Sequence, residues 1–167
     1  MMKLYVMRHG SAEEQSPSGN DESRALTPSG RDRVKDVGRK LVELQEAPKH
    51  IVCSPLVRAL QTAEIVHAHA KVDAPVEVND AMSPRGDALS MVRAAAHAGK
   101  KRLMVVGHEP DLSILVASLL GQPLASGFGK AMVVALRVPD ADADATLRFV
   151  LDPKSLELVI DERGADS

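Results

Sequence analysis

Two arginines and two histidines stand in short blocks that lie far apart in the sequence: Arg8-His9-Gly10, Ser54-Pro-Leu-Val-Arg58 and Gly107-His108-Glu109-Pro110. An arginine can bind two phosphate oxygens at once, and a neutral imidazole nitrogen can attack phosphorus. A second histidine can stabilise the charge that spreads over the equatorial oxygens during transfer. Brought together, these residues predict a cationic pocket for a phosphoryl group with a nucleophile at its centre. In such a pocket a metal ion is dispensable.

Each block comes directly after a stretch with the pattern of a β-strand, and helical patterns alternate with these strands. We expect strands at residues 3–7, 50–54, 76–78 and 102–106, and helices at residues 28–45, 55–69, 88–98 and 110–120. Thr27 and Pro28 are typical of the N-cap and the first residue of a helix. Ligands of such sheets bind at the carboxyl ends of the strands, so the three blocks are expected to lie together.

The alternation of strands and helices predicts an α/β fold for one domain over residues 1–167. We expect a three-layer α/β/α sandwich around a mostly parallel central sheet of about six strands. Residues 131–137 and 146–151 have the pattern of a hairpin, which predicts an antiparallel edge, and residues 156–160 are a candidate for a final edge segment.

The composition argues against several other classes of protein. With a net charge of -2, two Phe, one Tyr and no Trp, the chain offers neither a basic field nor stacking platforms for nucleic acid. No apolar run is long enough to span a membrane, and Arg8 interrupts the N-terminal apolar stretch before a signal-peptide core could form. The lone Cys53 cannot form an internal disulfide. We therefore expect a cytoplasmic protein that binds neither nucleic acid nor membrane.

The segment Leu4-Tyr-Val-Met-Arg8-His9-Gly10 resembles the signature of the histidine phosphatase superfamily, in the branch that contains the phosphoglycerate mutases. Three further segments are similar to the SixA-type phosphohistidine phosphatases: Arg24-Ala-Leu-Thr27-Pro-Ser-Gly30, Ser54-Pro-Leu-Val-Arg58-Ala-Leu-Gln61-Thr62-Ala63 and Val106-Gly-His108-Glu-Pro-Asp-Leu-Ser113. The resemblance extends from residue 3 to residue 160. It implies a phosphoglycerate mutase-like fold and a hydrolase that needs no metal and no organic cofactor.

Carried over by position, the resemblance implies that His9 is the phosphorylated nucleophile. Arg8, Arg58 and His108 would then bind and stabilise the transferring phosphoryl group. Gly10 and Glu109 are candidates for substrate binding because they adjoin these residues. Lys130 is a candidate for additional positive charge near the pocket.

The chain departs from its relatives at the proton donor. Phosphoglycerate mutase relatives have a carboxylate in the middle of the chain, and SixA-type relatives often have a glutamate there. In this chain the corresponding position is Ala81, and Asp80 precedes it by one residue, so Asp80 is a candidate proton donor. A departing alkoxide needs a proton in the transition state, whereas the imidazole of phosphohistidine can already carry one. The absence of the glutamate therefore favours a phosphohistidine substrate.

The leading hypothesis is dephosphorylation of phosphohistidine on a partner protein domain. An alternative is a phosphomonoesterase for a small phosphorylated metabolite, in which Asp80 or Glu13 supplies the proton. A third hypothesis, from another class, is a non-catalytic module that binds a phosphorylated ligand, since the same cationic pocket would bind phosphate without transfer. The intact His9 argues against this third hypothesis.

Overall fold

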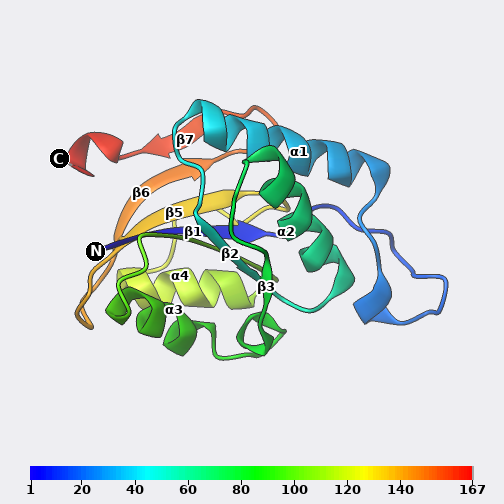
Figure 1. Cartoon of the computed structure of the whole chain (residues 1–167), viewed down its shortest axis with the longest axis horizontal. Helices are drawn as coiled ribbons and strands as arrows, with labels where there is room; N and C mark the ends of the chain where they lie inside the picture. Colours follow the sequence, from blue (N-terminus) through cyan, green and yellow to red (C-terminus); the bar gives the residue numbers. More distant parts are fainter. Residues whose placement is uncertain (167) are drawn as a thin grey trace.

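The computed structural model describes residues 1–166 and contains one seven-stranded sheet with helices on both faces (Figure 1). The strands are β1 (Met2–Arg8), β2 (His50–Cys53), β3 (Glu77–Val78), β4 (Arg102–Gly107), β5 (Val133–Val138), β6 (Thr146–Leu151) and β7 (Leu158–Asp161). The helices are α1 (Pro28–Glu43), α2 (Val57–His69), α3 (Ala88–His97) and α4 (Asp111–Leu120), with 3-10 turns η1 (Asp21–Ser23), η2 (Asp80–Met82) and η3 (Arg163–Asp166). The predicted α/β fold is confirmed.

The sheet has the strand order β3-β2-β4-β1-β5-β6-β7. The first four strands in this order are parallel, and β5, β6 and β7 continue the sheet by antiparallel pairing. The antiparallel part is thus larger than the edge hairpin that the sequence predicts, and the sheet has seven strands instead of about six. The additional strand is β7, a weak signal in the sequence because it lies at the edge and none of its residues is buried.

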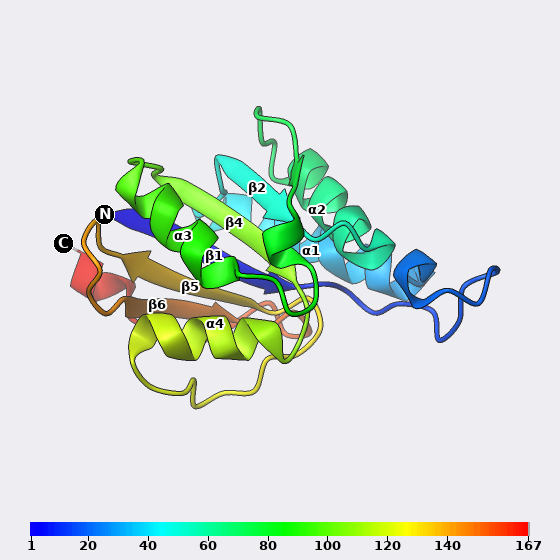
Figure 2. The ribbon, with the colours of Figure 1, turned by 90° about the horizontal axis from the view of Figure 1, so that it is seen from below.

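Helices cover the two faces of the sheet in pairs, with α1 and α2 on one face and α3 and α4 on the other (Figures 1 and 2). Side chains of β1 alternate between the two layers, because successive residues of a strand point to opposite faces. Tyr5 and Met7 pack in the core beneath α1 and α2, whereas Leu4 and Val6 pack in the core beneath α3 and α4. Both faces of β1 are therefore buried, as expected for the centre of an α/β sheet.

Local signals explain where the helices that flank the site begin. The side chain of Thr27 accepts the backbone N–H of Gly30 at 2.9 Å and caps α1, as predicted. Helix α2 begins at Val57, two residues later than predicted, because Leu56 has extended backbone and the Ser54 hydroxyl accepts its N–H at 3.2 Å.

The parallel strands bring the three sequence blocks to one edge of the sheet. Arg8 at the end of β1 is in register with Gly107 at the end of β4, and Cys53 at the end of β2 is in register with Val106. The residues that follow these strands are His9, Ser54 and His108. Within residues 1–166, no helix is both long and apolar enough to cross a bilayer.

Candidate active site

The two histidines lie side by side in the buried space between the ends of β1 and β4. Their ring centroids are 5.3 Å apart, and the ring planes are tilted by 52°. The backbone N–H of His9 donates to the carbonyl of Gly107 at 3.1 Å, which extends the β1–β4 pairing by one residue. Parallel pairing therefore brings the two histidines next to each other.

The protonation of His9 is set by its neighbour in the chain. Its Nδ1 lies 2.7 Å from the carbonyl oxygen of Gly10, which can only accept, so Nδ1 carries the proton. Burial lowers the pKa of His9 to about 4, and the neighbouring His108 and Arg58 act in the same direction. At neutral pH the ring is uncharged, and the lone pair of Nε2 is available for attack on phosphorus.

Gly10 is itself held by α2. Its N–H donates to Thr62 Oγ1 at 3.0 Å, and the Thr62 hydroxyl donates to the carbonyl of Arg58 at 2.8 Å. A Cβ atom at Gly10 would lie 2.8 Å from Cγ2 of Val34, so only glycine lets the chain pass this close to α1. These contacts fix the position of Gly10, whose carbonyl holds the His9 ring, and the substrate-binding role of Gly10 stays a prediction.

His108 is oriented by a serine from the end of β2. The Nε2 of His108 lies 2.8 Å from Ser54 Oγ, which also accepts the N–H of Leu56. When the Ser54 hydroxyl donates its proton to Nε2, the Leu56 N–H, the hydroxyl and Nε2 are all satisfied, and His108 Nδ1 carries a hydrogen that it can donate to a phosphoryl oxygen. Nδ1 is buried and has no partner among residues 1–166. Burial, followed by the charge of Arg58, lowers the pKa of His108 to about 4.

The two arginines leave donors for an anion. Arg8 Nη1 donates to the carbonyl of Phe128 at 3.0 Å, and the buried Nε of Arg8 has no partner within the described chain. Arg58 lies in the first turn of α2, and its Nε is likewise buried and unpaired within residues 1–166. Because a buried guanidinium N–H is costly to leave without an acceptor, these nitrogens favour an anionic ligand.

Asp21 covers Arg58 from the long loop after β1. Arg58 Nη1 donates to the Asp21 carbonyl at 3.0 Å, and Arg58 Nη2 donates to the Asp21 carboxylate at 3.3 Å. The carboxylate also accepts from Arg24 Nε at 2.8 Å. Asp21 is 64% exposed while Arg58 is 7% exposed, which allows a substrate phosphate to compete for the guanidinium from the solvent side.

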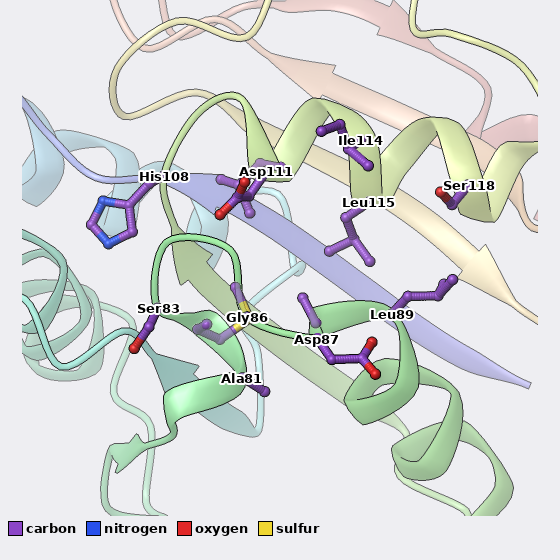
Figure 3. A pocket seen from close by; sticks show the side chains of 13 residues that line it. Ala81, Ser83, Gly86, Asp87, Leu89, His108, Asp111, Ile114, Leu115 and Ser118 are labelled. Carbon is purple, nitrogen blue, oxygen red and sulfur yellow. The ribbon is translucent and has the colours of Figure 1, made fainter.

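A cavity of about 210 Å³ opens beside His108, between η2 and α4 (Figure 3). Ala81 and Asp111 are among the residues that line it, and Figure 3 shows the Asp111 carboxylate at the same end as the His108 ring. The Asp111 carboxylate accepts the N–H of Arg85 at 2.6 Å. Asp80 is exposed and is not among the lining residues, so its position gives no support to a role as proton donor.

The carboxylate of Glu109, a predicted substrate-binding residue, forms hydrogen bonds at the start of α4. It accepts the N–H of Ser113 at 2.8 Å and the Ser113 hydroxyl at 2.6 Å. Both oxygens are therefore engaged at the start of the helix. Among residues 1–166, no group of three or more His, Cys, Asp or Glu side chains is arranged to hold a metal ion.

Sequence reasoning missed Ser54, Thr62 and Asp21 as parts of the site. Ser54 and Thr62 stand inside the segment that carries the family resemblance, so their place in that segment was a signal for the first two. No local pattern distinguishes Asp21 from the other polar residues of its loop.

Comparisons with known proteins show the family of this chain. The model of the histidine phosphatase superfamily (branch 1) matches residues 4–86. The phosphohistidine phosphatase SixA of Escherichia coli is 26% identical over 160 residues, which cover 94% of this chain and 98% of that protein. An uncharacterised protein of Picosynechococcus is 38% identical over 114 residues, covering 66% of this chain and 68% of the relative.

Solved structures show the same fold over nearly the whole chain. The protein histidine phosphatase SixA complexed with tungstate superposes with a TM-score of 0.84 at 25% identity, covering 93% of this chain and 100% of that structure. A SixA protein described as a putative phosphohistidine phosphatase, from Agrobacterium tumefaciens, superposes with a TM-score of 0.76 at 22% identity over 91% of this chain and 98% of that one. With its paired histidines and arginines at the carboxyl edge of the sheet, the chain belongs to the histidine phosphatase superfamily, and it is similar to SixA over nearly its whole length.

Proposed function

We propose that this protein is a phosphohydrolase that forms a covalent phosphoryl intermediate on Nε2 of His9. The observation that carries the proposal is the 2.7 Å hydrogen bond from His9 Nδ1 to the Gly10 carbonyl, which leaves Nε2 as the unprotonated nitrogen. A neutral nucleophile lies among cations that can bind the phosphoryl oxygens, so attack needs no prior deprotonation at neutral pH.

In the first step, the Nε2 lone pair of His9 forms a bond to phosphorus while the bond from phosphorus to the leaving group breaks. Arg8, Arg58 and His108 stabilise the charge on the three peripheral oxygens. His9 keeps its Nδ1 proton, so the phosphorylated ring is positively charged, and the Gly10 carbonyl stabilises that charge. The electron pair of the broken bond departs with the leaving group.

In the second step, a water oxygen attacks phosphorus, and the electron pair of the N–P bond returns to His9 Nε2. The proton lost by the water is carried away by the released phosphate or by solvent. The protonated phospho-ring is a good leaving group because it departs as neutral imidazole. The enzyme returns to its starting protonation state without a bound cofactor.

We propose phosphohistidine on a partner protein as the substrate. Its leaving imidazole already carries a ring proton, which fits Ala81 at the cavity wall where relatives often have a glutamate. Similarity over 94% of the chain to a protein named phosphohistidine phosphatase supports the same substrate class.

A second candidate is a phosphomonoesterase for a small metabolite. The specific observation in its favour is Asp111, whose carboxylate lines the same cavity as His108 and could protonate a departing alkoxide there. Fold neighbours include an alpha-ribazole phosphatase from Shigella flexneri, at 18% identity. The non-catalytic module remains the third hypothesis, and it predicts binding without transfer.

The test measures phosphate release by wild type, His9→Ala and His97→Ala in EDTA, from a phosphohistidine-bearing protein and from a panel of phosphomonoesters. His97 is 52% exposed and pairs with Asp142, so its substitution controls for the loss of a histidine. We expect release from phosphohistidine that requires His9 and is unchanged in His97→Ala. Faster release from esters would favour the metabolite enzyme. Binding of a phosphorylated ligand, with no phosphorylated His9 detected when the reaction is quenched without acid, would favour the non-catalytic binding module.

A further inference from the structure

A second and larger cavity adjoins the phosphoryl site on the side of α1. It has a volume of about 560 Å³, and Arg8, Ser11, Ser29, Arg33, Lys130 and Lys154 are among the residues that line it. No residue lines both this cavity and the one beside His108. Figure 1 shows the first turn of α1 at the edge of the sheet where β1 ends, and the hydrogen bond from Thr27 N to the Ser11 carbonyl at 3.0 Å joins the two segments.

The charge around this cavity is strongly unbalanced. Four cationic side chains line it against one carboxylate, that of Asp152. The Asp152 carboxylate already accepts the backbone N–H and the hydroxyl of Ser155, each at 2.8 Å. Among residues 1–166, no carboxylate forms an ion pair with Arg33, Lys130 or Lys154. The walls therefore attract anions.

Arg33 distinguishes this cavity from an ordinary solvated surface. Lys130 and Lys154 are exposed, so water can hydrate their ammonium groups. Arg33 is half-buried and lines the cavity, and its Nη1 is buried without a hydrogen-bond partner among residues 1–166. A guanidinium with a nitrogen left unpaired in this way is stabilised by an anion bound beside it.

We propose that this cavity binds a second anionic group of the substrate, a carboxylate or a phosphate on the same molecule as the phosphoryl group that His9 receives. The inference rests on the proposed phosphohydrolase function and adds a determinant of specificity to it. Arg8 lines the cavity and also provides donors to the phosphoryl site, so a single substrate can reach both. Arg33, Lys130 and Lys154 would select substrates with an acidic side chain or a second phosphate near the reacting phosphorus.

Binding can be tested without turnover, using phosphonates that cannot be hydrolysed. Alkyl phosphonates and carboxyalkyl phosphonates of matched, graded chain length are titrated calorimetrically into wild type, Arg33→Met and Arg31→Met. Arg31 is exposed on the same helix and does not line the cavity, so it controls for the loss of one charge. We expect one length of carboxyalkyl phosphonate to bind wild type and Arg31→Met about tenfold more tightly than its alkyl counterpart. Arg33→Met should abolish that preference and leave alkyl phosphonate binding unchanged.

The source of the anionic group is distinguished by kinetics. Phosphohistidine peptides with glutamate or glutamine beside the phosphohistidine represent a protein substrate, and bisphosphorylated sugars against monophosphorylated ones represent metabolites. In wild type we expect faster turnover of the more anionic member of one of these two substrate pairs. The pair for which this preference disappears in Arg33→Met identifies the source of the anionic group. The proposal would be overturned if wild type showed no preference for the carboxyalkyl phosphonate at any chain length. It would also be overturned if Arg33→Met lost the same binding affinity for the alkyl and the carboxyalkyl phosphonate. Failure of the phosphohydrolase function appears separately, as phosphonate binding without any His9-dependent phosphate release.

Discussion

Replacing Ser54 with alanine tests how the second histidine is oriented. The Ser54 side chain is fully buried, and its hydroxyl contacts His108 Nε2 at 2.8 Å and the N–H of Leu56 at 3.2 Å. The substitution removes the donor that holds His108 with its hydrogen on Nδ1, and it leaves the Leu56 N–H without an acceptor. We expect the free energy of unfolding to fall by about 2 kcal/mol, because two buried hydrogen bonds are lost.

The effect on catalysis follows from the His108 tautomer. Without the hydroxyl, His108 loses its preference for the form that donates to phosphoryl oxygen, and a hydrogen bond to a charged group is worth about 1.5–3 kcal/mol. We therefore expect kcat/KM for phosphate release to fall by about ten- to a hundredfold. Nitrogen-15 NMR of the His108 ring should show the proton moving from Nδ1 toward Nε2. Thr146→Ala, which removes an exposed hydroxyl from the start of β6, should change neither kcat/KM nor the His108 tautomer.

A double-mutant cycle separates positioning from general destabilisation. If Ser54 acts through His108, then Ser54→Ala should cause no further loss of kcat/KM in a His108→Ala background. An equal loss in both backgrounds, or an unchanged His108 tautomer in Ser54→Ala, would refute the reasoning. Activity is measured below the unfolding transition of every variant, so that loss of folded protein does not enter kcat/KM.

Three further predictions concern packing, the anion site and pH. Gly10→Ala should destabilise the fold by about 1–3 kcal/mol through the contact with Val34, and denaturant titration should show a partial recovery when Val34→Ala is added. No recovery would contradict the steric argument. Asp21→Asn should lower the inhibition constant of inorganic phosphate about two- to fivefold, because it removes a negative charge beside Arg58, and weaker inhibition would contradict this. The pKa of His9 is about 4 in the folded protein and ~6.5 in the unfolded chain, so the unfolded state binds the proton more tightly. The free energy of unfolding is therefore unaffected by this group above pH ~6.5 and falls as the pH is lowered toward ~4. Urea unfolding should show that the fall in the free energy of unfolding over this pH range is about 3 kcal/mol smaller in His9→Ala than in wild type. An equal fall in both proteins would refute the assignment to His9.

The fold and the centre of the candidate site could be predicted from the sequence because their signals are local. Period-two and period-3.6 patterns indicate strands and helices, and the rule for parallel sheets places His9, Arg58 and His108 at one edge. The least accurate predictions were at the ends of elements: residues 55 and 56 precede α2, with Leu56 extended, and β7 joins the sheet through its pairing with β6.

The roles of the supporting residues depended on tertiary structure. Ser54 and His108 are 54 positions apart, and Asp21 and Arg58 are 37 apart, so no spacing rule relates them. The surroundings of the candidates Glu109 and Asp80 also came only from the tertiary structure: Glu109 accepts hydrogen bonds at the start of α4, and Asp80 lies on an exposed turn. The sequence alone determined which chemistry the chain carries, because residue type limits reactivity. Tertiary structure decided each ring's protonation, each arginine's partners and the charged walls around them, because these depend on hydrogen bonds and burial between distant segments.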